Sequence, residues 1–302
     1  MLIGCQINKE EGFMSETSEK KLRMIAESIR LVTLQTMANF GSGHIGGAMS
    51  IVETLAVLYG SELLCDPKDP SWEKRDRLVC SKGHAGAAVY AALALRGFFP
   101  QEKLAEYNQS GGSLPGHCDM NKVPGIDMTT GSLGQGMSAA CGMALAMKMD
   151  DSKNVTYLIV GDGECDEGQI WEGAMFAAHY HLSNLIMFVD KNGQQLDGFT
   201  KTIMNTESLA EKFEAFGWFT QEVNGHDPEE IKNAIRKAKQ GTGKPNAIIL
   251  DTIKGYGIPF AEGREGNHHM TFTPEMIQET TDIIYARLSE LSGTPDGKKE
   301  GE

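Results

Sequence analysis

Three continuous apolar runs limit most strongly what this chain can fold into. They occupy residues 155–160, 185–190 and 247–252, and each is almost wholly apolar. Strands that are buried on both faces have this pattern, whereas strands with one wet face alternate apolar and polar residues. Stretches with helical spacing lie between the runs, which favours parallel strands joined by crossover helices. We therefore predict an α/β fold of three layers, α/β/α, around a mostly parallel sheet.

Shorter patterns complete the predicted elements. Two further segments, 77–81 and 219–223, are predicted to be strands that join the sheet. Residues 108–133 are rich in Gly, Ser and Pro and are expected to form a loop. Apolar residues at helical spacing predict helices at 19–38, 48–60, 85–97, 135–149, 168–181, 207–216, 227–239 and 273–291.

The chain is expected to contain one domain. No internal repeat and no strong boundary divides residues 15–291. Residues 1–14 are interpreted as a flexible N-terminal extension, in which Met14 is an alternative start to Met1. The polar tail 292–302 is expected to be disordered.

Composition excludes several classes of function. The formal net charge of −13 makes the chain a poor binder of nucleic acid or of anionic membranes. No apolar run approaches the roughly 20 residues that span a bilayer, and no basic segment followed by an apolar one marks a signal peptide. Six scattered cysteines without a CxxC pair indicate reduced thiols. We therefore expect a cytoplasmic protein without a nucleic-acid or membrane partner.

The most informative motif lies at the ends of two predicted strands. Asp162 and Glu164 belong to a Gly-Asp-Gly-Glu segment directly after the run 155–160, and Asn192 follows the run 185–190. Because ligands of parallel sheets bind beyond the carboxyl ends of strands, these side chains are expected at one edge. Carboxylate and carbonyl oxygens suit Mg²⁺, which shares its ligand shell with phosphates. Gly-Asp-Gly alone is more often a simple turn, but the Asn at the next strand end favours a cation site that holds a diphosphate.

Histidines form the second group of candidates. The chain has eight, and those in glycine- or asparagine-flanked loops are His44, His84, His117 and the pair His268-His269. Neutral imidazoles donate hydrogen bonds to phosphate and sugar hydroxyls and move protons near pH 7. A single loop histidine is more often a solvated surface residue, but four such positions favour a shared site. The remaining ones lack this context and are interpreted as structural, namely His179, His181 and His226.

A glycine-rich segment at residues 129–136 opens a predicted helix. A dinucleotide-binding loop requires an apolar strand directly before it, and the preceding residues 124–128, Pro-Gly-Ile-Asp-Met, are not such a strand. A loop that admits a flat ring is therefore favoured over a Rossmann loop for NAD.

Together these motifs resemble those of thiamine-diphosphate enzymes, and within them those of transketolase. The superfamily motif, Gly-Asp-Gly followed by a later Asn, matches Asp162 and Asn192. Narrower transketolase features match at Gly43-His44, Ser81-Lys82-Gly83-His84, Leu114-Pro115-Gly116-His117, Thr130–Gly136 and Leu196-Asp197-Gly198. The resemblance extends over about residues 18–285. It implies the thiamine-diphosphate-binding fold and a transketolase activity, because branches such as the 2-oxoacid dehydrogenases lack the histidine set.

The resemblance also implies roles for individual residues. Mg²⁺ (or Ca²⁺) would be held by Asp162, Asn192 and the backbone carbonyl of Gln194. Thiamine diphosphate would contact His84, Gly131, Ser132, Leu133, Gly163, Glu164, Asn192 and His268. The implied catalytic residues are His44, His117, His268 and Glu167. Of these, Glu167 would link two active sites across a dimer, and His269 is an alternative to His268 because the motif around them is altered.

The main departure from transketolases is length, since those chains are much longer and the resemblance covers only their diphosphate-binding domain. It implies a split enzyme with this chain as its N-terminal subunit, whereas a C-terminal subunit supplies the pyrimidine-binding domain in an α2β2 heterotetramer. The implied reaction transfers a two-carbon ketol unit from a ketose phosphate to an aldose phosphate, and we expect no activity without the partner. Pentose-phosphate sugars are the default substrates. A specialised sugar remains an alternative substrate, because the residues that bind the substrate phosphate belong to the other subunit.

Two other functions stay open. The chain is alternatively a subunit of another split thiamine-diphosphate enzyme, of the 2-oxoacid decarboxylase or dehydrogenase type. It is alternatively a non-catalytic scaffold subunit that kept the fold. The glycine-flanked histidines argue against the first alternative, and the intact pair of Asp162 and Asn192 argues against the second.

Overall fold

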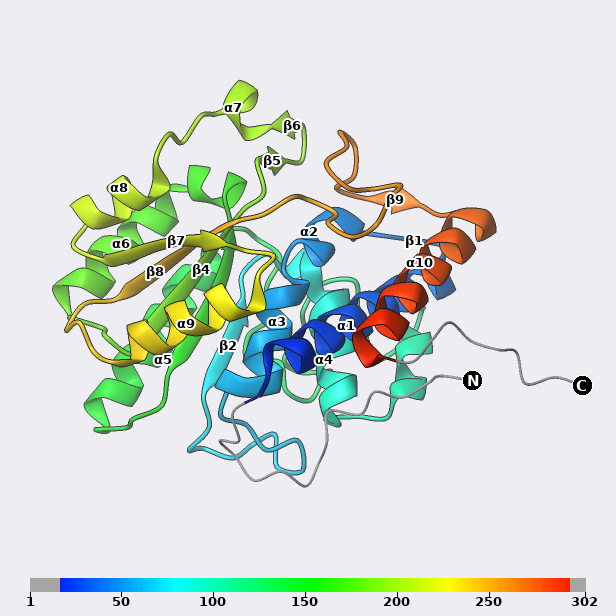
Figure 1. The fold of residues 1–302 in the computed structure, drawn as a ribbon. Helices are drawn as coiled ribbons and strands as arrows, with labels where there is room; N and C mark the ends of the chain where they lie inside the picture. Colours follow the sequence, from blue (N-terminus) through cyan, green and yellow to red (C-terminus); the bar gives the residue numbers. More distant parts are fainter. Residues whose placement is uncertain (1–16, 294–302) are drawn as a thin grey trace, which may run out of the picture.

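The computed structural model describes residues 17–293 (Figure 1). The predicted extension 1–14 and residues 294–302 of the predicted tail lie outside the described residues. The last helix, α10 (Pro274–Ser292), continues one residue beyond its predicted end and is capped by Gly293, whose φ is 75°.

A five-stranded parallel sheet lies at the centre of the fold, as predicted. Its strand order is β2-β3-β4-β8-β7. The strands are β2 (Arg77–Cys80), β3 (Thr156–Gly161), β4 (Leu185–Lys191), β8 (Asn246–Asp251) and β7 (Phe219–Asn224). Gly161 pairs with Asp190, so the carboxyl ends of β3 and β4 are level with each other.

Alternate residues of the strands build two hydrophobic cores, one on each face of the sheet. On β3, Tyr157 and Ile159 belong to one core, whereas Leu158 and Val160 belong to the other. The first core is covered by α1 (Glu19–Phe40), α3 (Val52–Val57), α4 (Gly86–Arg96) and α9 (Pro228–Lys239), and α10 packs on α1. The second is covered by α5 (Gln135–Met149), α6 (Gly168–His179) and α8 (Leu209–Ala215). The three layers are seen in Figure 1.

The predicted helix 48–60 is divided in the structure. It consists of α2 (Ile45–Met49), α3 and a π-helical turn (Leu58–Glu62). The break lies at Ile51, whose backbone is not helical (φ −113°, ψ 9°). Beside it, the buried Ser50 hydroxyl donates to Asp190 Oδ2 at the end of β4, at 2.7 Å.

Short elements that the sequence pattern did not predict bring distant loops together. Strand β1 (Ser42–Gly43) pairs antiparallel with β9 (Met270–Thr271), which places the segment around His44 beside the segment around His268. Strands β5 (Gln194–Gln195) and β6 (Gly198–Phe199) form a small hairpin, followed by α7 (Thr200–Ile203).

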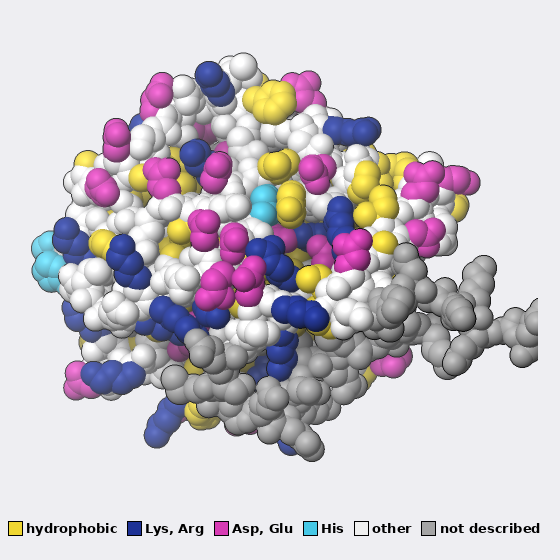
Figure 2. Space-filling view, viewed as in Figure 1, with side chains coloured by type: hydrophobic (Ala, Val, Ile, Leu, Met, Phe, Trp, Pro, Cys, Tyr) yellow, Lys and Arg dark blue, Asp and Glu magenta, His cyan; other side chains and the backbone are white. Residues whose placement is uncertain are grey.

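Charged side chains of both signs cover the described surface, and the described cysteines lie inside the fold. On the face in Figure 2, acidic and basic side chains are interspersed over the described residues and form no continuous basic patch. Within residues 17–293, no helix combines the length and apolarity needed to cross a membrane. The cysteines in this range are free and buried: Cys65, Cys80, Cys118, Cys141 and Cys165.

Candidate active site

Asp162 and Asn192 meet at the carboxyl ends of β3 and β4. Asp162 is 3% exposed; its Oδ1 accepts from the N–H of Gly163 at 2.9 Å and its Oδ2 from the N–H of Gly193 at 2.8 Å. The Asn192 amide donates to Asp190 at 2.8 Å, and Asn192 Oδ1 accepts from the N–H of Gln194 at 3.1 Å. The two strand ends are thus tied together, with the three predicted metal ligands in adjoining loops.

The electrostatics of this strand-end pair favour a cation. Burial and the neighbouring charge of Asp190 raise the pKa of Asp162 to about 7. Burial opposes ionisation of Asp190 too, but its ion pair with Lys82 holds the pKa of Asp190 below the ordinary value. Asp162 has no such partner among the described residues. A bound cation would remove the penalty on its charged form.

The predicted ligand set contains a single carboxylate. Within residues 17–293, no three His, Cys, Asp or Glu side chains are grouped to hold a metal ion. One carboxylate with amide and backbone oxygens suits Mg²⁺ that completes its shell with phosphates and water. The residues therefore fit a diphosphate-bound Mg²⁺ rather than a metal held by protein alone. A cavity of about 380 Å³ has Asp162 and Asn192 in its wall.

Five histidine rings form a cluster beside this pair. The centre of the His44 ring lies 4.8–5.7 Å from the ring centres of His84, His117, His268 and His269. Burial and neighbouring positive charges lower the pKa of His44 and of His268 to about 4, and that of His84 well below its usual value. These three rings are therefore neutral at pH 7. The loop histidines predicted to share a site do lie together, and His269 is part of the same cluster.

The glycine-rich loop borders the cluster at Gly131. This residue has φ of 154°, and a Cβ placed on it would lie 3.2 Å from Cδ2 of His117. A side chain here would therefore crowd the cluster. Leu133 is half-buried, whereas Ser132 is exposed. Gly163 is similarly restricted, because its Cβ would lie 2.7 Å from Cβ of Gln195.

The two predicted glutamates lie in different surroundings. Glu164 is 2% exposed and accepts from the hydroxyl of Ser81, from the N–H of Gly134 at 2.8 Å and from the N–H of Gly161 at 3.0 Å. Its carboxylate therefore joins three segments of the chain. Glu167 is exposed at the start of α6.

Sequence reasoning assigned no role to two buried lysines at this site. Lys82 and Lys254 are 2% and 3% exposed. Burial and the charge of Lys82 lower the pKa of Lys254 to about 8. A lysine within two residues of the end of a predicted strand was the available signal, since Lys82 directly follows 77–81 and Lys254 lies two residues after 247–252.

Comparison with known proteins identifies the class to which this fold and site belong. Residues 21–285 match the family model described as transketolase, thiamine diphosphate binding domain. The chain belongs to this family.

Individual relatives sharpen this result. The chain is 54% identical to the 6-deoxy-6-sulfo-D-fructose transketolase subunit of Clostridium sp. (strain MSTE9), over 83% of this chain and 91% of that one. It is 42% identical to an apulose-4-phosphate transketolase subunit of Actinobacillus succinogenes, over 83% of this chain and 90% of that one. The structure of Pichia stipitis transketolase with sedoheptulose 7-phosphate has a TM-score of 0.80 and 31% identity, over 91% of this chain and 45% of that one.

These likenesses confirm the predicted family, fold, function and enzyme class. The chain has the three-layer fold of a thiamine-diphosphate-binding domain, and it is a transketolase-type enzyme subunit of the split form. It spans less than half the length of the Pichia chain but nearly matches the two relatives named as subunits.

Proposed function

We propose that this chain acts as a cytoplasmic transketolase together with a C-terminal, pyrimidine-binding subunit, in an α2β2 heterotetramer. It transfers a two-carbon ketol unit from a ketose phosphate, or a similarly anionic ketose, to an aldose phosphate. The observation that carries the proposal is the cluster of five histidine rings beside the buried Asp162 and the half-buried Asn192. The word subunit in the relatives' names supports the partner chain.

The proposed cofactors are thiamine diphosphate and Mg²⁺ (or Ca²⁺). Asp162, Asn192 and the backbone carbonyl of Gln194 would hold the metal. The diphosphate would lie near His84, Gly163 and His268, and the ring near Gly131 and Leu133. When bound, thiamine diphosphate supplies the electron sink that lets the carbon–carbon bond beside a ketose carbonyl break.

The histidines supply proton transfer. A neutral imidazole has one nitrogen that donates a proton and one that accepts a proton. Because the pKa of His44 is lowered to about 4 and that of His117 is lowered by burial, both rings are available as bases at pH 7. We assign to them the removal of a hydroxyl proton from the sugar and its return to the acceptor product. Glu167, exposed at the start of α6, is assigned to the contact between two active sites.

The relatives' names also suggest which sugars to test first. The 54% identical relative is named for 6-deoxy-6-sulfo-D-fructose, a ketose with an anionic sulfonate at the end far from its carbonyl. We propose this sugar as the first donor to test, ahead of apulose 4-phosphate and the pentose-phosphate sugars.

The test uses the full chain with and without its co-expressed partner subunit. Calorimetry measures the binding of thiamine diphosphate with Mg²⁺, and ketol transfer is assayed with the three ketose classes. We expect transfer only in the presence of the partner, and His117→Ala is expected to reduce it about 10²- to 10⁴-fold. Robust transfer by the single chain would contradict the split enzyme. Activity on a 2-oxoacid in place of ketol transfer, unchanged in His117→Ala, would favour an enzyme of the 2-oxoacid type, and failure to bind the cofactor would favour a scaffold.

A further inference from the structure

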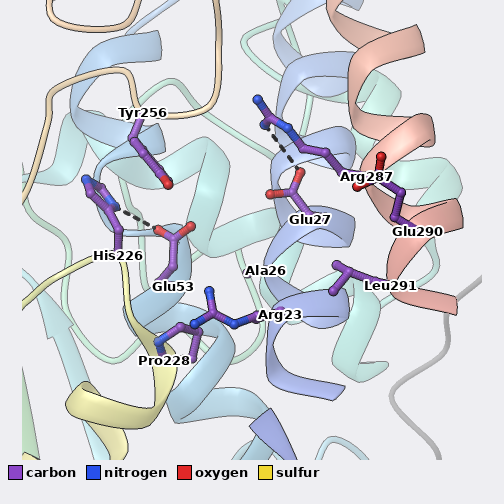
Figure 3. A pocket seen from close by; sticks show the side chains of 10 residues that line it. All are labelled: Arg23, Ala26, Glu27, Glu53, His226, Pro228, Tyr256, Arg287, Glu290 and Leu291. Carbon is purple, nitrogen blue, oxygen red and sulfur yellow. Dashed lines mark hydrogen bonds and ion pairs between the residues drawn. The ribbon is translucent and has the colours of Figure 1, made fainter. Parts of the chain in front are cut away.

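A second cavity, of about 330 Å³, lies apart from the residues assigned to the metal, the cofactor and the proton transfer (Figure 3). Its wall is built by α1, α3, the turn after β7, the loop after β8 and the end of α10. Sites for small molecules have volumes of roughly 300–1,000 Å³. The cavity is therefore large enough for a small metabolite.

A closed network of hydrogen bonds forms one side of this cavity. The N–H of Ile253 donates to Nε2 of His226 at 2.8 Å, so Nδ1 of this ring carries the proton and faces Glu53 at 3.3 Å. Glu53 also accepts from the buried guanidinium of Arg30. The ring of His226 stacks on that of Tyr256, with ring centres 3.6 Å apart. Because these groups hold one another, this side of the cavity is preformed and its carboxylate is already paired.

Glu27, which also lines the cavity, is not satisfied in this way. Its Oε2 is buried and accepts no hydrogen bond from the described residues. Two guanidinium groups lie near its carboxylate without a hydrogen bond to it, since Arg30 Nε is 3.5 Å from Oε1 and Arg287 Nη1 is 3.7 Å from Oε2. Figure 3 shows the Glu27 carboxylate and the Tyr256 hydroxyl turned toward the same space. A buried acceptor without a donor is costly, so Glu27 suits a donor that enters the cavity.

Arg287 supplies a positive charge beside this carboxylate. Its Nη1 donates to the carbonyl of Gly257 at 3.1 Å. Among the described residues, its Nε and Nη2 donate no hydrogen bond. The other charged groups of the wall are less suited to a ligand, because Arg23 is paired with two acidic residues and Glu290 is exposed. A free acceptor on Glu27 and free donors on Arg287 therefore lie side by side.

We propose that this cavity binds an α-amino acid with an apolar side chain, at a site that does not depend on the proposed transketolase activity. The ammonium donates to Glu27 Oε2 and the carboxylate accepts from Arg287, and hydrogen bonds between charged groups are the stronger kind. One carbon atom separates the two groups in an α-amino acid, so both reach protein charges that lie 3.7 Å apart. An amine or a carboxylic acid satisfies only one of them. The side chain contacts the apolar part of the wall, which contains Ala26, Pro228 and Leu291.

Calorimetry on the full chain with its co-expressed partner subunit tests the site. The probes are L-leucine and L-phenylalanine. Each is compared with its analogue without the ammonium, 4-methylpentanoate or 3-phenylpropanoate, and with its analogue without the carboxylate, 3-methylbutylamine or 2-phenylethylamine. We expect a Kd of about 0.1–1 mM for at least one amino acid and binding about 10-fold weaker for both of its analogues. No binding of either amino acid at about 10 mM, or analogues that bind as well as the amino acid, would overturn the proposal.

Substitutions locate the bound amino acid. Glu27→Gln and Arg287→Gln are each expected to raise its Kd about 10-fold. In Glu27→Gln, the amino acid and its analogue without the ammonium are expected to bind alike, because the partner of the ammonium is gone. Glu279→Gln is the matched control, since Glu279 is exposed on α10 and does not line the cavity. Urea denaturation confirms that each variant is folded. Undiminished binding in folded Glu27→Gln and Arg287→Gln would place the amino acid elsewhere and overturn the proposal.

Discussion

Acid is expected to remove the stability that the neutral rings of the histidine cluster contribute to this chain. An unfolded histidine takes up a proton as the pH falls through 6.5, whereas His44 and His268 in the folded chain stay neutral until about pH 4. At these two rings, protons therefore bind preferentially to the unfolded state between these values, and their contribution to the free energy of unfolding decreases as the pH is lowered. The physical cause is burial of the rings, with repulsion from the other histidines and from Lys254.

The size of the effect follows from the same values. For one ring, a pKa that falls from 6.5 to about 4 costs about 1.8 kcal/mol of stability between pH 7 and pH 5 by linkage. Because both rings are only half-buried, solvent screening reduces this figure, and we halve it. The pair is then expected to lose about 2 kcal/mol.

The measurement is urea denaturation of the full, cofactor-free chain at pH 7, 6 and 5. The wild type is compared with a double variant that carries both His44→Gln and His268→Gln. This variant keeps polar side chains at the two positions but removes both titrating groups. The wild type is expected to lose about 2 kcal/mol more than the double variant across this range. Parallel stability curves for the two proteins would refute the assignment of low pKa values to these rings.

Two further substitutions test the structural parts of the site, each by urea denaturation at pH 7. Glu164→Ala leaves two buried donors and one part-buried donor without an acceptor and is expected to cost about 2–4 kcal/mol. Glu167→Ala, at an exposed carboxylate, is expected to stay within about 0.5 kcal/mol; equal losses would contradict the tethering role of Glu164. Gly131→Ala strains a backbone with φ of 154° and crowds His117, at an expected cost of about 1–2 kcal/mol. Its control, Gly142→Ala on the exposed side of α5, is expected to stabilise by about 0.5–1 kcal/mol, and a cost at Gly142 as large as at Gly131 would speak against strain.

The location of Asp162 and Asn192 was predictable because sheet geometry determines it. The runs 155–160 and 185–190 pair as neighbours with their ends in register. Residues that follow two such ends must lie together, whatever the rest of the chain does. The apolar runs and the residues that follow them were therefore sufficient to predict where Asp162 and Asn192 lie.

The histidine cluster was not predictable by the same reasoning. His44 and His268 lie far apart in the sequence and are joined by a two-residue pairing, Ser42 with Thr271 and Gly43 with Met270. A contact of that length leaves no periodic pattern, and the tight turns around it depend on packing of the whole domain. The number of histidines in glycine- or asparagine-flanked loops and the resemblance to transketolase motifs were the two signals that these loops share a site.

The buried charges explain what sequence reasoning missed, and they are consistent with the ligand that we propose. Asp190 ends an apolar run and Lys82 directly follows one, and their ion pair within the chain makes them tolerable there. Asp162 and Lys254 carry the opposite charges of a second pair, yet they do not bond to each other. A carboxylate and an ammonium kept buried but apart leave one place for a cation and one for an anion. That arrangement is unfavourable for the chain alone and complementary to a metal diphosphate, which brings both charges at once.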